Sequence, residues 1–102
     1  MKELVIPPPA KRDSNSVEMI RTWIAEQGLH CTINVGLYRD NGEHNEATAW
    51  GIILADVVRH LANAVEERYG DNQNSTIKAV VRSFAKELQL PTSEADGYFW
   101  HN

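Results

Sequence analysis

The stretch Leu29-His30-Cys31-Thr32-Ile33-Asn34-Val35-Gly36-Leu37-Tyr38 places apolar side chains at its odd-numbered positions and mostly polar residues between them. Successive side chains of a β-strand point to opposite faces of a sheet, so this alternation predicts a half-buried strand over residues 29–38. Cys31 falls in the apolar register and is predicted to be a buried small hydrophobe, because a reactive thiolate needs an electropositive, partly exposed setting. His30 faces the other way, either as a surface residue or with a binding role.

The segment before this strand has the spacing of a helix. Asn15 could cap its N-terminus, and Glu18 stands three residues later, as in a capping box. Gly28 is a natural stop, because glycine enters the left-handed conformation cheaply. The segment therefore predicts a helix over residues 16–27. Its apolar residues recur at helical intervals: Val17, Ile20 and Ile24.

The N-terminus supplies a second strand and a stiff connection. Residues 3–6 carry a short apolar run that predicts a strand, parallel to the 29–38 strand through a right-handed crossover. Pro7-Pro8-Pro9 predicts an extended, polyproline-like lead-in, with an aromatic-groove ligand as the alternative.

The C-terminal half predicts two helices. Asp40-Asn41-Gly42 has the composition of a turn, after which an apolar stripe covering about half the helix circumference runs over residues 46–69 as far as Gly70. A second helix is predicted over residues 75–89 with Asn74 as its cap, and Pro91 prevents its continuation. Gly51, inside the first of these helices, is expected where another element approaches closely.

Together these elements predict one α+β domain over residues 1–102. Two strands, about 3–6 and 29–38, would form a small sheet, and the helices over about 16–27, 46–69 and 75–89 would cover it as a second layer. The proline-rich lead-in (7–9) precedes this core. Residues 92–102 form a tail that carries Tyr98-Phe99-Trp100, and the sequence leaves open whether this tail joins the sheet.

Four stretches of the chain form a recognisable pattern: Asn15-Ser16-Val17-Glu18-Met19-Ile20, Trp23-Ile24-Ala25-Glu26, Gly28-Leu29-His30-Cys31, and residues 49–60, Ala-Trp-Gly-Ile-Ile-Leu-Ala-Asp-Val-Val-Arg-His. These stretches resemble a family of small bacterial proteins that is known only as a domain of unknown function. The resemblance covers most of the chain and implies a stand-alone bacterial domain. It supplies no activity and no functional residues.

Charge and composition exclude some classes of function. Fourteen acidic residues against ten basic ones give a net charge of −4, which disfavours a nucleic-acid binder, since phosphate neutralisation by cations supplies most of such a protein's affinity. No apolar run is long enough to cross a membrane. A single cysteine excludes an intrachain disulfide, and we expect a cytoplasmic protein.

Two rows of polar side chains are the candidate sites. Asp56 and His60 are one turn apart at the border of the apolar stripe, where they could form a general-base pair or half of a metal site, or simply a solvated helix face. Arg59 lies beside them as a candidate anion ligand or a partner of Glu66. The second row could meet an acidic partner or phosphate groups, or be an ordinary exposed face: Lys78, Arg82 and Lys86.

Metal and cofactor sites are not expected. The four histidines lack the short paired spacings of structural zinc sites, and one cysteine does not compensate. No cofactor-binding motif is present. The histidines are His30, His44, His60 and His101.

The sequence therefore favours a non-catalytic interaction or structural domain that self-associates as a homodimer. The wide apolar stripe, the open strand edges and three consecutive aromatic residues are all typical of surfaces that a second copy covers. The competing interpretation is that the 75–89 helix and the tail fold back and cover these surfaces within one chain. The alternative is a small enzyme or small-molecule binder with a pocket near Asp56, Arg59 and His60. No protein partner other than a second copy is indicated.

Overall fold

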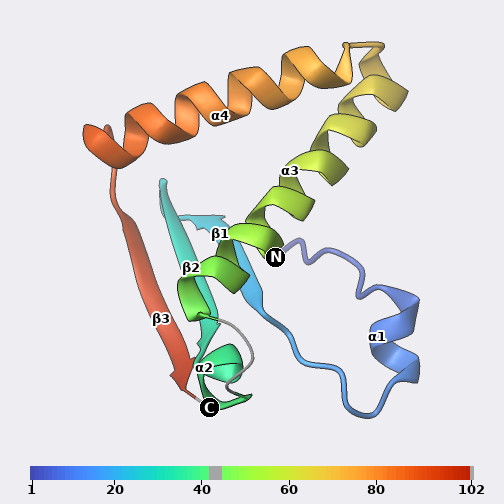
Figure 1. Ribbon diagram of the computed structural model, residues 1–102, viewed down its shortest axis with the longest axis vertical. Coiled ribbons are helices and arrows are strands. Elements are labelled where there is room, and N and C mark those ends of the chain that lie inside the picture. The colour runs from blue at the N-terminus through green and yellow to red at the C-terminus, as the bar shows by residue number, and fades with distance from the viewer. Residues whose placement is uncertain (42–44, 102) are drawn as a thin grey trace.

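A computed structural model describes residues 1–41 and 45–101, and it confirms the predicted α+β class. The described residues form four helices and a three-stranded sheet (Figure 1). Their order is α1 (Pro8–Arg12), β1 (Ile20–Ala25), β2 (Gly28–Val35), α2 (Leu37–Asn41), α3 (Glu46–Tyr69), α4 (Gln73–Gln89) and β3 (Ala95–His101).

Strand β2 is the centre of the sheet, with β1 antiparallel on one side and β3 parallel on the other. The strand predicted over residues 29–38 is thus confirmed for its first part, but it ends at Val35. Gly36 takes a left-handed φ of 103°, and Leu37 begins the short helix α2. The turn expected at Asp40-Asn41-Gly42 falls partly outside the described residues, and Asn41 is the last residue of α2.

The helix predicted over residues 16–27 is wrong, because residues 20–25 form β1. Ile20 pairs with Ile33 and Ile24 with Leu29 across an antiparallel ladder. Residues spaced by four satisfy the strand period of two as well as the helical period, and β-branched side chains such as those of Ile20 and Ile24 favour strands.

A two-residue turn joins β1 to β2. Glu26 and Gln27 hold φ angles of 50° and 63°, the left-handed conformation that a tight hairpin turn of this hand requires. Glutamate and glutamine rarely adopt that conformation. The turn also lacks the Asn-Gly or Asp-Gly pair that would mark such a hairpin in a sequence.

The N-terminal segment also differs from the expectation. Residues 3–6 belong to no strand, so the strand predicted there is wrong. Only Pro7 is extended, whereas Pro8 begins helix α1, where a proline at the first position loses no intrahelical hydrogen bond. The polyproline-like lead-in over residues 7–9 is therefore replaced by one extended residue and a short helix.

The C-terminal tail joins the sheet, which the sequence had left open. Residues 95–101 form β3, whose register places Ala95 beside Leu29 and Phe99 beside Ile33. The sheet thus has three strands rather than two. The three aromatic residues are strand residues that alternate between its faces.

The two long helices match the sequence closely. Helix α3 spans residues 46–69 as predicted; Asn45 caps it by accepting from the Ala47 and Thr48 N–H groups, and Gly70 ends it at a φ of 79°. Helix α4 starts two residues earlier than predicted, because Asn72 rather than Asn74 is its cap. Gln73 Nε2 donates to Glu66 Oε1 across the turn between the helices at 2.8 Å.

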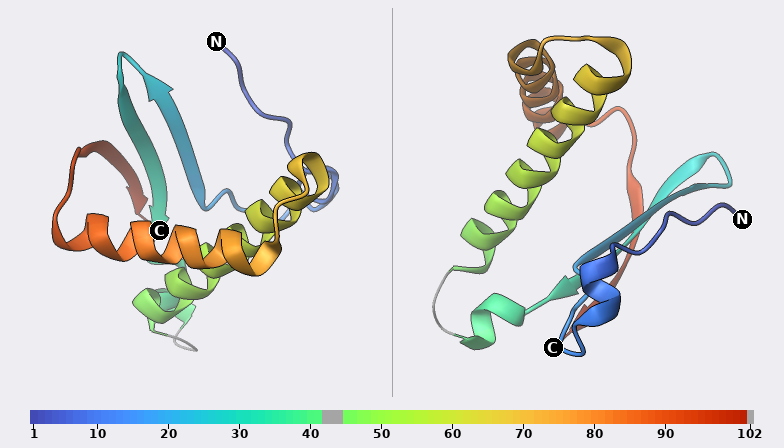
Figure 2. Two further views of the ribbon diagram at one scale, coloured as in Figure 1. Left: turned by 90° about the horizontal axis from the view of Figure 1, so that it is seen from above. Right: turned by 90° about the vertical axis from the view of Figure 1, so that its right-hand side faces the viewer.

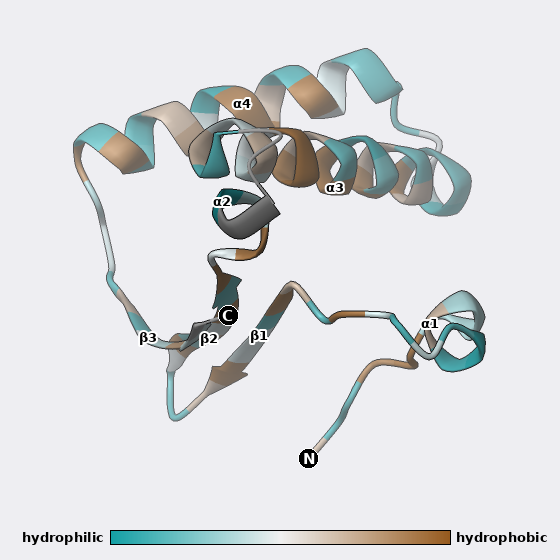
Figure 3. Cartoon of the chain, turned by 60° about the horizontal axis from the view of Figure 1, so that its bottom comes forward, coloured by the Kyte–Doolittle hydropathy of each residue, from teal (hydrophilic) through white to brown (hydrophobic). Residues whose placement is uncertain are grey.

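The long helices α3 and α4 do not pack extensively on the sheet. Helix α3 rises away from the sheet, and α4 returns across the top to β3 (Figures 1 and 2). Among the described residues the main contacts join β1 to β2, β2 to β3, α3 to α4 and α2 to α3, with none of comparable extent between the sheet and α3 or α4. Hydrophobic residues nevertheless recur along the helices and the strands (Figure 3). The only apolar side chains that the described part of the chain buries are Ala49 and Ala62.

Candidate functional site

The polar row on α3 is fully on the surface. Arg59 Nη2 donates to Asp56 Oδ1 one turn earlier, and these side chains are 68% and 58% exposed. Asp56 thus contacts Arg59 rather than His60, and Glu66 accepts from Gln73 rather than from Arg59. An exposed ion pair of this kind contributes little to stability.

The basic row lies on α4 as its spacing predicts. All three side chains of this row are exposed, and nearby Glu87 turns away from them to accept from the Thr92 N–H and hydroxyl groups at 2.9 and 2.8 Å. Those two hydrogen bonds hold the pKa of the Glu87 carboxyl below its ordinary value. The row is formed by Lys78, Arg82 and Lys86.

His30 and Cys31 point to opposite faces of β2, as expected for neighbours in a strand. His30 Nε2 donates to the carbonyl of Ala25 at 3.0 Å, and its Nδ1 lies 3.8 Å from Asp96 Oδ2. Cys31 is only half-buried within one chain, and Thr22 donates its hydroxyl to the Cys31 sulfur at 3.7 Å. The complete burial expected for Cys31 is therefore not reached in a single copy.

A carboxylate that sequence reasoning missed organises the junction between sheet and helices. Glu46 Oε1 accepts from the Gly36 N–H at 3.0 Å and from the Trp50 indole at 3.2 Å, while Oε2 accepts from the Arg39 N–H at 3.0 Å. The Gly36 bond, assisted by the others and opposed by desolvation, holds the pKa of the Glu46 carboxyl below its ordinary value. The sequence shows an acidic residue in the first helical turn, but it does not show which groups elsewhere in the chain donate hydrogen bonds to it.

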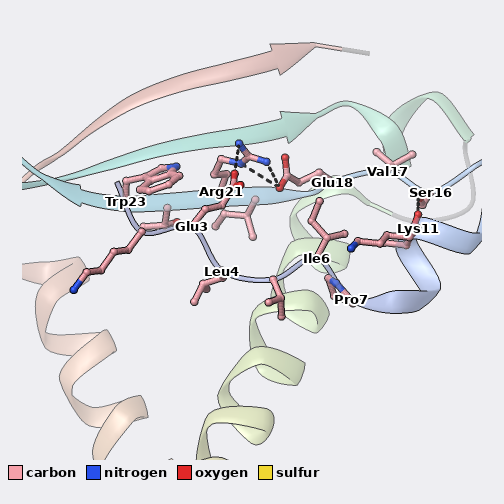
Figure 4. A pocket seen from close by; sticks show the side chains of 15 residues that line it. Glu3, Leu4, Ile6, Pro7, Lys11, Ser16, Val17, Glu18, Arg21 and Trp23 are labelled. Atoms are coloured by element: carbon pink, nitrogen blue, oxygen red, sulfur yellow. Dashed lines mark hydrogen bonds and ion pairs between the residues drawn. The ribbon is translucent and has the colours of Figure 1, made fainter.

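A groove of about 740 Å³ separates the N-terminal segment from β1 (Figure 4). Residues 2–7 form one wall and residues 20–23 the other, and Glu3 and Glu18 both bind Arg21, at 3.4 and 3.1 Å. The arginine is thus occupied by carboxylates, and the groove offers no base–nucleophile pair. Asp56, Arg59 and His60 do not line it, nor do they line a smaller groove beside Trp100.

The described residues offer neither a metal site nor a membrane span. Within residues 1–41 and 45–101, no three His, Cys, Asp or Glu side chains gather closely enough to hold a metal ion. No helix in the same part of the chain is both long enough and apolar enough to cross a bilayer. His44 lies outside the described residues.

The dominant surface feature is exposed hydrophobic area. One side of the sheet, here called the apolar sheet face, has Ile24 85%, Leu29 42% and Phe99 73% exposed. The pairing register puts the following on it: Ile20, Thr22, Ile24, Leu29, Cys31, Ile33, Val35, Ala95, Gly97 and Phe99.

The opposite side of the sheet, here called the aromatic sheet face, mixes rings with polar groups. Tyr98 and Trp100 are exposed there, on the same face as Trp23 and His30. Asn34 is buried, and its side-chain amide donates to the Glu18 carbonyl at 3.5 Å.

The helices expose the rest of their apolar stripes. Val57 and Leu61 on α3 and Phe84 and Leu88 on α4 all remain on the surface, Leu88 with 71% of its area exposed. Gly51, where close approach was expected, has open space around it: a Cβ there would meet nothing within 4 Å. That expectation is wrong within a single chain.

Comparisons with known proteins place the chain in a family without assigning it an activity. The family model described as a domain of unknown function (DUF5076) matches residues 3–92. No curated protein matches the sequence. Among solved structures, a protein from the photosynthetic bacterium Rhodopseudomonas palustrus described as a "putative pyruvate dehydrogenase" aligns with a TM-score of 0.65 at 22% identity, over 93% of this chain and 91% of that one. At that identity the likeness shows a shared fold.

Proposed function

The chain belongs to the family of domains of unknown function DUF5076, and we propose that it works as a non-catalytic, self-associating structural domain whose active form is a homodimer. The observation that carries this proposal is the surface area. One copy exposes 8933 Å², whereas a compact monomer of 11.5 kDa exposes about 5,800 Å².

The excess of about 3,100 Å² per chain, or about 6,200 Å² for a pair, is at the upper end of the total area that large obligate interfaces bury. The radius of gyration agrees, since it is 15.5 Å against about 13 Å for a compact domain of this length. Exposed hydrophobic patches of this extent are unusual on proteins that act as monomers.

Twofold pairing is the form proposed, because closed cyclic dimers are the commonest homo-oligomers. A non-catalytic role is supported by the open setting of the candidate site residues on α3. Asp56, Arg59 and His60 stand on an exposed helix rather than in either groove.

Light scattering coupled to size exclusion at micromolar concentration tests the proposal. We expect a mass of twice the 11.5 kDa chain. A mass of one chain across the micromolar range would overturn it. Leu88→Gln is expected to shift the equilibrium toward the monomer, and Arg82→Gln, two turns earlier on the polar side of α4, serves as the matched control.

A further inference from the structure

We propose that the apolar sheet face of one copy is covered by the α3–α4 hairpin of a second copy, reciprocally about a twofold axis. This inference rests on the proposed self-association and specifies which surfaces make it. The occupant of each surface is therefore a second copy of this chain.

The two surfaces are the halves of one hydrophobic core. A sheet buries one apolar face and a helix buries one apolar stripe, and a stable domain packs these against each other. In this chain the sheet presents Ile24 and Phe99, and the helices present Leu61 and Leu88, all four of them exposed. Each surface has the chemistry that the other needs.

Within one copy the two halves do not meet. The hairpin diverges from the sheet beyond the first turn of α3, as the side view in Figure 2 shows, and no extensive contact joins them within the described residues. Ala62, the one completely buried apolar side chain of the described part, lies in the contacting α3–α4 pair and not against the sheet.

Reciprocal exchange also satisfies symmetry and area. Each chain carries one sheet and one hairpin, so a twofold pair completes two sheet–helix cores and leaves neither half uncovered. Covering both halves of each chain is the way to bury most of the excess surface of about 3,100 Å² per chain.

The apolar sheet face is a better docking surface than the aromatic sheet face. Over β1 and β2 the apolar face carries Thr22 and otherwise apolar residues, so little polar surface has to lose water there. The aromatic face presents Arg21, which pairs with Glu3, and His30, whose Nδ1 lies 3.8 Å from Asp96 Oδ2, and burying such polar groups costs free energy.

Charge complementation between two variants tests this pairing. Ile24→Asp alters only the sheet face, and Leu88→Lys alters only the hairpin; both side chains are largely exposed in one copy, so neither change removes packing within a chain. Each variant alone is expected to dimerise at least about tenfold more weakly, because a buried charge faces an apolar surface in both interfaces.

Mixing the two variants should restore the dimer. In a heterodimer one interface is unaltered and the other sets aspartate against a hairpin that carries lysine. The mass from light scattering should then return to that of two chains. Thr32→Asp on the opposite sheet face and Arg82→Glu on the polar side of α4 are the matched controls, which should dimerise like the parent.

The possible results distinguish the sheet–hairpin pairing from self-association in general. A parent protein that is a monomer overturns both. A parent dimer that is indifferent to Leu88→Lys, or variants whose mixture stays as weak as each alone, overturns the sheet–hairpin pairing and leaves self-association standing. Intermolecular nuclear Overhauser effects in a mixed labelled–unlabelled dimer, expected between Leu29 and Leu88 methyl groups, supply a second readout that does not depend on substitution.

Discussion

Glu46 at the first position of α3 accepts a hydrogen bond from the backbone N–H of Gly36 at 3.0 Å, and so ties the start of the long helix to the end of the central strand. The bond is the main reason why the pKa of this carboxyl is lowered. Two further donors, the Arg39 N–H and the Trp50 indole, share the same carboxylate. One ionised side chain thus fixes the path of the chain from β2 through α2 to α3.

Glu46→Gln should lower the thermal midpoint at neutral pH, because an amide is a weaker acceptor than a carboxylate and has one oxygen for three donors. The folded pKa lies below the unfolded one, so the carboxylate's stabilisation is fully present above the unfolded value near 4.5 and is lost as pH falls through the folded value. The difference in midpoint between parent and variant should therefore shrink between pH 6 and pH 3, roughly the range over which carboxyl groups titrate. A difference that stays constant with pH would contradict the role of the charge.

Residues that readily adopt a positive φ should stabilise the turn between β1 and β2. Replacing Glu26-Gln27 by Asn-Gly should raise the free energy of unfolding by about 1–2 kcal/mol, because both positions have a positive φ. Urea denaturation measures this change. The reverse control is Gln27→Val, which should destabilise the protein, since a β-branched residue is strained in that conformation.

Gly51 and Gly70 should respond oppositely to alanine. Gly51 lies inside α3 with open space around it, so Gly51→Ala should stabilise the chain by about 0.5–1 kcal/mol. Gly70 holds a φ of 79°, so Gly70→Ala should destabilise the chain by about 1 kcal/mol, although a Cβ there would also meet nothing within 4 Å. A destabilising Gly51→Ala would instead reveal a surface of the second copy packed against this position.

The labelling rate of the Cys31 thiol should depend on dimerisation. Cys31 lies on the apolar sheet face and is half-buried in one copy, so a thiol reagent should label it slowly in the dimer and faster as dilution releases the monomer. The labelling rate at a series of protein concentrations measures this. Rapid labelling at every concentration would show that the sheet face stays open, and equally slow labelling after dimer dissociation would show that a single chain closes over it.

Local rules predicted the helices better than the strands. Helices α3 and α4 carry their own period and their own caps, Asn45 and Gly70 among them, so their positions follow from adjacent residues. Strand β1 was mistaken for a helix because Ile20 and Ile24 fit both periods, and only pairing with β2 decides between them. Strand β3 could not be found locally, since its partners lie far away in the sequence.

The candidate site shows the same division. The exposed rows on α3 and α4 were placed correctly on their helix faces by spacing alone. The pairing of Arg59 with Asp56, and the three donors around Glu46, depend on rotamers and on the path of the chain, which periodicity does not encode. The wide apolar stripe of α3 predicted exposed hydrophobic surface on that helix. The exposed hydrophobic surface of the sheet was harder to predict, because part of it belongs to β3.

The parallel pairing of β2 with β3 has a consequence for synthesis of the chain. Val35, at the end of β2, meets its neighbour His101 only after α3 and α4 have been made. On the ribosome the sheet must therefore wait as a two-stranded hairpin, which is marginal in water, until residues 95–101 leave the exit tunnel. A nascent chain that stops at Pro91 would carry both long helices and still lack β3, so proteases should distinguish it sharply from a chain that includes residues 95–101.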